Sequence, residues 1–328
     1  MRRDPATHNY QLNNSEQAYR FFTSNFHLPV ATSEIGSGAE IKTLKELRVG
    51  VPADNLTIAG LARKLAGQIT RPAIPASDAA RNEWASRERE RLRGVVRMNP
   101  VSVENAWRLW NTKHQGLETL SYRFDFSNGL SATGVWLKAI VALPTAPATI
   151  VLNDKGKKAA GAVVSDRVNR AEQVMALEPL FNGATIPQEP DPTDWETLTA
   201  TTGDRPLGLQ VGQLLAVVRW LRSGSGSGPV RLETDGIRTQ LVALVAAALE
   251  PSAFSSVVNH HGMQSLSYLL DKPVPFRSAP ELFCLDFYKY FDLDRLAAVA
   301  SPAKISTLGS PEPSVESTQP SSGGETDD

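Results

Sequence analysis

The chain has 328 residues, of which 41% are hydrophobic and 21% are charged, and its formal net charge is −1. This near-neutral balance, without a long Lys/Arg block, argues against nucleic acid as the main partner, and no segment reaches the roughly 18–20 apolar residues of a membrane span. The single cysteine, Cys284, excludes an internal disulfide and a cysteine-based zinc site. Basic residues at positions 2 and 3 have no apolar core behind them, so the chain as written indicates the cytoplasm.

The first 80 residues predict a small opening unit and a linker. Residues 1–30 contain a polar turn with His8, followed by a helix over 17–22 that Ser15 would cap. Residues 31–80 carry scattered Gly, Pro, Ser and Thr and predict a linker with one short helix near 58–65.

The segment from 81 to 307 predicts one α/β domain. A helix over 80–97 precedes two strands joined by the hairpin signal Asn128-Gly129, and β-α alternation follows. Antiparallel strands before alternating strands and helices predict a three-layer sandwich around a mostly parallel sheet. The expected strands are 120–126, 130–143, 148–152, 173–177, 230–232, 255–259 and 303–307. The expected helices are 167–170, 207–221, 238–249, 280–291 and 293–300. Residues 308–328 lack aromatic residues and predict a disordered tail.

The junction over 229–249 is the most informative feature. A β-rich run meets a helix-forming run that is apolar on every side, across a turn with one glycine. Such a junction presents the nucleophile in α/β-hydrolases. The apex is expected at Gly236 or Ile237, and neither can attack a carbonyl. Asp235 is the nearest nucleophilic group, but at the apex it would place Glu233 and Ile237 where small residues belong.

The other catalytic parts are also incomplete. Glu312, after the last predicted strand, is the candidate acid, and no histidine follows residue 261, where the general base is expected. His260 and His261 follow a predicted strand, and adjacent residues on an extended chain point to opposite faces, so the two histidines are poorly placed to bind one metal ion. We predict neither a metal nor a cofactor. The loop with Asn153, Asp154 and Gly156 lies where oxyanion-hole amides would be expected.

Several runs resemble the bacterial acetyl xylan esterase-like α/β-hydrolases over residues 80–307. They are Trp84 with 91–93, then 151–154, 246–251, and 286–296 with Ala303. The resemblance implies an α/β-hydrolase-like fold that lacks its final strand and helix. The chain is similar to the second half of tandem-domain proteins. In this resemblance, residues 1–30 are the end of a preceding hydrolase domain, and His8 is the general base of that domain. Residues 1–30 would then fold onto the sheet edge after 303–307, and the longer protein would be exported.

Three functions follow as expectations. The first is a degenerate hydrolase with little or no catalysis, in a structural or carbohydrate-associated role beside an active domain. The second is an active carboxylic-ester hydrolase that deacetylates xylan or a similar carbohydrate through Asp235 or a partner domain's serine. The third is an interaction module whose open sheet edge pairs with a partner strand. The corresponding partners are an acetylated carbohydrate, an upstream hydrolase domain or a second copy of the chain.

Overall fold

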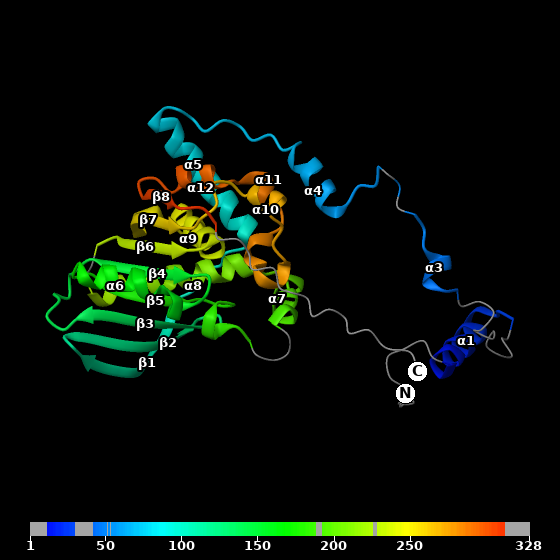
Figure 1. Ribbon diagram of the computed structural model, residues 1–328, viewed down its shortest axis with the longest axis horizontal. Helices are drawn as coiled ribbons and strands as arrows, with labels where there is room; N and C mark the ends of the chain where they lie inside the picture. The colour runs from blue at the N-terminus through cyan, green and yellow to red at the C-terminus, as the bar shows by residue number, and fades with distance from the viewer. Residues whose placement is uncertain are drawn as a thin grey trace. The chain divides into compact units, whose positions relative to one another are not determined.

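The computed structural model divides into two compact units, residues 1–57 and residues 58–328. The residues that it describes are 12–29, 42–50, 52, 54–187, 192–225 and 228–311. In the first unit these include helices α1 (Leu12–Phe26) and α3 (Leu44–Leu47) (Figure 1). Thr43 and Glu46 cap α3 reciprocally, through Thr43 N–H to Oε2 (2.9 Å) and Glu46 N–H to Oγ1 (3.3 Å). The predicted domain boundaries at residues 30 and 80 stay predictions.

The second unit contains an eight-stranded sheet in the order β1-β2-β3-β5-β4-β6-β7-β8. The first three strands are antiparallel, β3 is also antiparallel to β5, and β5, β4, β6, β7 and β8 are mutually parallel. This arrangement confirms the predicted mostly parallel sheet. The strands are β1 (Val103–His114), β2 (Leu117–Phe126), β3 (Ser131–Ala139), β4 (Ala148–Asn153), β5 (Gln173–Glu178), β6 (Val230–Asp235), β7 (Phe254–His260) and β8 (Lys304–Leu308).

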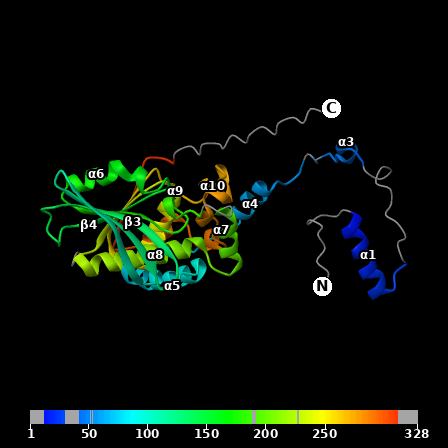
Figure 2. The same ribbon diagram turned by 90° about the horizontal axis from the view of Figure 1, so that it is seen from below.

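Helices cover both faces of the sheet, so the three-layer prediction is confirmed. One face packs into a single large core with α5 (Asp78–Val96), α8 (Pro206–Ser225), α9 (Ile237–Leu249) and α12 (Leu293–Val299). The other face packs a smaller core with α6 (Gly161–Asn169), which lies opposite α5 and α8 (Figure 2). Among the described residues, the remaining elements are α4 (Ile58–Ala66), α7 (Pro192–Thr201), α10 (Tyr268–Asp271), α11 (Phe287–Tyr290) and five short 3-10 helices, η1 (Lys157–Ala160), η2 (Gly183–Thr185), η3 (Pro251–Ala253), η4 (Phe276–Ser278) and η5 (Pro280–Phe283). None of the helices described is long and apolar enough to cross a membrane.

Helix α9 lies at the centre of the large core and positions the turn before it. All residues from Thr239 to Leu249 are buried, because α5, α8 and α12 surround the helix on the side away from the sheet. A helix that is apolar on every side requires such burial. The turn from β6 into α9 is therefore held firmly at the edge where the parallel strands end.

Several elements differ from the sequence prediction. Strand β1 was not predicted, because extra residues near Glu104 and Leu109 shift its register with β2 and break the alternation of side chains. The helix predicted over 280–291 is broken into η5 and α11, which are separated by an extended residue at Cys284. Helix α6 also begins at Gly161, six residues before the predicted start at 167.

Candidate functional site

Gly236 makes the turn between β6 and α9. Its backbone has φ 104° and ψ 170°, a combination that is nearly exclusive to glycine. Its N–H donates to the carbonyl oxygen of His260 (2.9 Å), which ties the turn to β7. Of the two apex positions that the sequence allows, Gly236 and Ile237, the structure places the turn at Gly236.

The carboxylate of Asp154 occupies the space that a side chain at residue 236 would need. A Cβ built on Gly236 would lie 2.3 Å from both Cγ and Oδ2 of Asp154, well inside any real contact distance. A serine or cysteine at this position would have to displace that carboxylate. The place from which an α/β-hydrolase nucleophile projects is therefore filled by a side chain from the loop after β4.

Asp154 binds the first turn of α9. Its Oδ1 accepts hydrogen bonds from the backbone N–H and the hydroxyl of Thr239 (both 2.8 Å), and its Oδ2 accepts the backbone N–H of Arg238 (3.0 Å). These amides lack partners within the helix, so a carboxylate stabilises this end through hydrogen bonds and the helix dipole. Burial raises the pKa of Asp154, and the hydrogen bonds from Thr239 and Arg238 oppose that rise.

This contact occupies two backbone N–H groups beside the predicted oxyanion-hole loop, whose role stays a prediction. An oxyanion hole needs N–H groups that can receive the negative charge that develops on a substrate. Two N–H groups at this turn, those of Arg238 and Thr239, already bind the Asp154 side chain. Asn153 and Gly156 serve the loop itself, because Gly156 N–H donates to the Asn153 carbonyl (2.9 Å) and Asn153 Oδ1 accepts the Lys155 N–H (2.8 Å).

Arg238 closes the site from the helix side. Its guanidinium pairs with Glu281, which is only 1% exposed (Nη2 to Oε2, 3.3 Å), and donates to the carbonyl oxygen of Phe181 (3.0 Å). Burial alone would lower the pKa of Arg238, but the Glu281 carboxylate more than offsets this effect and holds that pKa above its ordinary value. The ion pair thus fixes α9 to the segments after β5 and β7.

Little open space remains beside this ion pair. The cavity that Arg238, Thr239 and Glu281 line has a volume of about 10 Å³. That volume holds about one water molecule. Sites for small molecules commonly measure about 300–1,000 Å³. This cavity is therefore far smaller than a typical small-molecule site.

Asp235 is the last residue of β6 and pairs with His261. The distance from Oδ1 to His261 Nδ1 is 2.7 Å, and Oδ2 accepts the side-chain amide of Asn153 (3.2 Å). The side chains of Asp235 and His261 are 33% and 44% exposed. Asp235 thus lies one residue before the apex with both carboxylate oxygens engaged, while a histidine held by a carboxylate is the orientation that general bases use.

His260 and His261 contact different carboxylates. His260 Nε2 lies 3.3 Å from Oε2 of Glu233, whose Oε1 also pairs with Arg167 and Arg231 (both 2.6 Å). The two imidazoles therefore do not converge on one point. In the part of the chain that the structure describes, no three His, Cys, Asp or Glu side chains gather as metal ligands.

His8 and Glu312 lie outside the described residues, so their predicted roles stay predictions. What the sequence reasoning missed is the contact of Asp154 with α9 and the Arg238–Glu281 pair. Asp154 and Arg238 are 84 positions apart, and Arg238 and Glu281 are 43 apart. The one available signal was an acidic residue in a loop that the strand order brings to a helix start, where negative charge is favoured.

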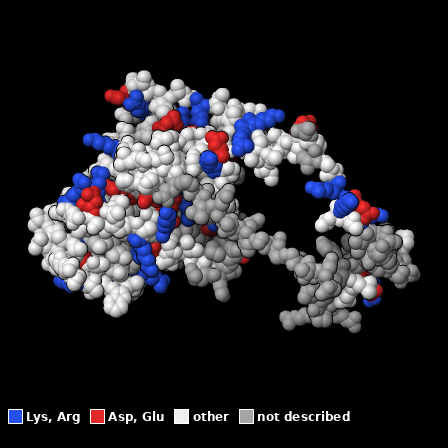
Figure 3. Space-filling model, in the orientation of Figure 1, with Lys and Arg blue, Asp and Glu red and all other residues white. Residues whose placement is uncertain are grey.

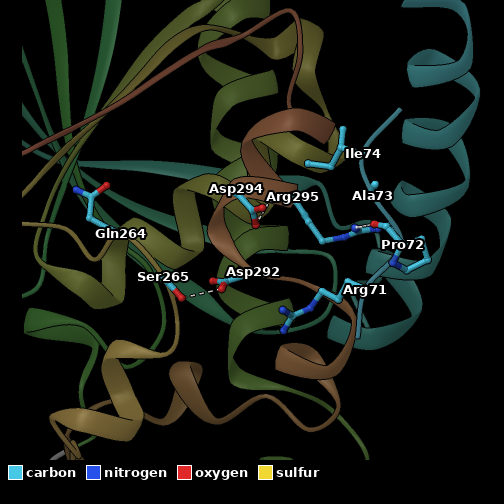
Figure 4. Close-up of a pocket in the computed structure, with 9 residues that line it drawn as sticks. All are labelled: Arg71, Pro72, Ala73, Ile74, Gln264, Ser265, Asp292, Asp294 and Arg295. Atoms are coloured by element: carbon cyan, nitrogen blue, oxygen red, sulfur yellow. Dashed lines mark hydrogen bonds between the residues drawn. The ribbon is translucent and has the colours of Figure 1, made fainter. Parts of the chain in front are cut away.

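A larger cavity lies away from the turn, between residues 71–74, the loop after β7 and the start of α12 (Figure 4). Its volume is about 490 Å³. Ser265 Oγ donates to Asp292 Oδ2 (2.7 Å), and Arg295 Nη1 donates to the carbonyl oxygen of Pro72 (2.6 Å). Its polar groups thus tie 71–74 and the β7 loop to α12, and no histidine or cysteine lines it.

No family model and no curated protein matches this chain. Among solved structures, a candidate acetyl xylan esterase from Bacteroides fragilis is similar with a TM-score of 0.64 and 14% identity, over 79% of this chain and 77% of that one. The glucuronoyl esterase from Solibacter usitatus has a TM-score of 0.47 and 12% identity, over 74% of this chain and 81% of that one. The acetyl xylan esterase from Paenibacillus sp. R4 has a TM-score of 0.45 and 11% identity, over 75% of this chain and 92% of that one. Together with the sheet order and the layers, the first likeness establishes an α/β-hydrolase-like fold.

Proposed function

We propose that this chain is an α/β-hydrolase-fold protein with little or no catalysis of its own, in a structural or carbohydrate-associated role. The observation that carries the proposal is the contact between Gly236 and Asp154. The apex has no reactive side chain, and a carboxylate that binds the start of α9 fills its space. Removing the nucleophile from a serine hydrolase lowers kcat by about 10⁶.

A competing function is an active carboxylic-ester hydrolase, and the exposed Asp235–His261 pair is the observation that favours it. In this alternative, Asp235 attacks the ester, or His261 acts as the base for a serine from a partner domain. The position of Asp235 before the apex, together with its two hydrogen bonds, makes it a weak nucleophile. We therefore prefer the first proposal.

Hydrolysis of p-nitrophenyl acetate separates these functions. The wild-type protein is compared with Asp235→Asn and His261→Ala, and Asp166→Asn serves as the matched control because it removes an exposed carboxylate that pairs with Arg170 (3.1 Å). We expect the same slow background rate for all four proteins. Turnover that is lost in Asp235→Asn and kept in Asp166→Asn would replace the first proposal with the second.

A carbohydrate-associated role is supported by the fold likeness to a protein described as a candidate acetyl xylan esterase. Calorimetric titration with acetylated xylo-oligosaccharides tests this part. Binding without release of acetate would support a carbohydrate-binding role for a non-catalytic domain. Absence of heat at millimolar ligand would leave the structural role as the better proposal.

A further inference from the structure

Strand β1 leaves one edge of the sheet open. It is 12 residues long, it pairs only with β2 among the described residues, and nearly all of its side chains are exposed (Figure 1). Trp107, Leu109 and Trp110 are 54%, 58% and 72% exposed. On the face seen in Figure 3, the surface at the lower left is mostly uncharged, although β1 itself carries Glu104, Arg108 and Lys113. A long, exposed edge strand that carries large apolar side chains is a template for pairing with another chain.

The two tryptophans of β1 lie on the same face of the sheet despite their odd spacing. Trp107 is opposite Arg123 of β2 and Trp110 is opposite Ser121, because Leu109 is an extra residue in β1. The partner positions differ by two, and residues two apart on a strand share a face. The indole N–H of Trp107 donates to Asp125 Oδ2 (2.7 Å), which holds its ring on this face.

We propose that two copies of this chain pair antiparallel through β1, with Trp107 of each copy opposite Trp110 of the other. In this register Glu104 lies opposite Lys113 of the second copy. The two-fold symmetry of such a pair makes each contact occur twice. Aromatic pairs and opposite charges placed directly across two strands both stabilise the pairing.

The sequence of β1 favours a second copy over an unrelated strand, because it complements itself in this one register. Asn105 and Thr112, which lie on the same face as the tryptophans, also come opposite one another. A shift by one residue would bring side chains of opposite faces together and would separate Glu104 from Lys113. Strand β8, at the other edge, has five residues and no such pattern. This inference does not depend on whether the chain is catalytic.

Charge reversal combined with mixing tests both the partner and the register. Sedimentation or light scattering is measured over a concentration series for the wild type, Glu104→Lys and Lys113→Glu. We expect a wild-type dimer, and about tenfold or more weaker association for each variant alone, because two attractive pairs become repulsive. An equal mixture of the two variants should regain the dimer, because the introduced lysine then faces the introduced glutamate and the native pair remains.

Lys304→Glu on β8 is the matched control, because it reverses a charge on the other edge strand and should leave the dimer unchanged. Thermal unfolding checks each variant, since Lys113 also contacts Glu118 within the chain (Nζ to Oε1, 3.7 Å) while Glu104→Lys leaves that contact intact. A wild-type protein that stays monomeric up to about 100 μM would overturn the proposal. The proposal would also be overturned by a dimer whose dissociation constant is unchanged in both charge-reversal variants, or by a mixture of the variants that stays monomeric.

Discussion

Replacing Gly236 by alanine tests whether the Asp154 carboxylate fills the apex of the turn. The new Cβ would lie 2.3 Å from Cγ and Oδ2 of Asp154, at φ 104° and ψ 170°. The backbone strain at such a position costs about 1–3 kcal/mol. Displacing the carboxylate removes a helix cap, which costs about 1–2 kcal/mol more. We therefore expect Gly236→Ala to lower the free energy of unfolding by about 2–5 kcal/mol.

The double variant makes this test specific. Asp154→Ala alone loses the cap and its interaction with the helix dipole, about 1.5–3 kcal/mol together. In Gly236→Ala/Asp154→Ala the cap is lost only once and the clash is absent. The decrease in the free energy of unfolding should therefore be about 1–2 kcal/mol smaller than the sum of the decreases in the two single variants. Urea unfolding of the four proteins gives these differences. Additivity to within about 0.5 kcal/mol would refute the claim that the two positions compete for one space.

Three further predictions concern the groups around this turn and the core. Removing the carboxylate of buried Glu281 leaves Arg238 unpaired, so Glu281→Gln should lower the free energy of unfolding by about 3 kcal/mol in urea titrations; a loss below 1 kcal/mol would contradict the assigned pair. Burial raises the pKa of Glu178, but its bonds from Lys157 and from two backbone amides outweigh that effect and hold the pKa below its ordinary value of 4.5. The carboxylate therefore adds to the free energy of unfolding above that pH, and this contribution is lost as the pH falls. The free energy of unfolding of the wild type should exceed that of Glu178→Gln by more at pH 7 than at pH 3, and an equal difference at both pH values would contradict this. Burial raises the pKa of Cys284 to about 12, so alkylation at pH 8 should be orders of magnitude slower in the folded protein than in urea, and equal rates would place the thiol in solvent.

The parts of the fold that the sequence predicted are those with a local signal. The turn at Gly236 and helix α9 were found because a β-rich run, one glycine and an unbroken apolar helix adjoin one another. The strands β2 to β8 follow the same logic of alternation or short apolar runs. Strand β1 was not predicted, because its register shifts break the alternation of polar and apolar side chains.

The candidate site was harder to predict, because its decisive contacts are not local. The sequence placed Asp154 in the loop expected to carry oxyanion-hole amides, but its hydrogen bonds to Arg238 and Thr239 depend on how two loops meet in space. The sequence predicted oxyanion-hole amides in this loop, and it gave no sign that the Asp154 carboxylate would cap α9. The pairing of Asp235 with His261 was also not foreseen, because consecutive histidines give no sign of which carboxylate each will contact.

We propose that this polypeptide forms no acyl bond at the turn after β6. Incubation with an organophosphonate ester probe, followed by intact-mass measurement and peptide mapping, addresses it most directly. We expect an unmodified mass under conditions that fully label an active serine esterase measured alongside. A stoichiometric adduct on this chain would contradict it.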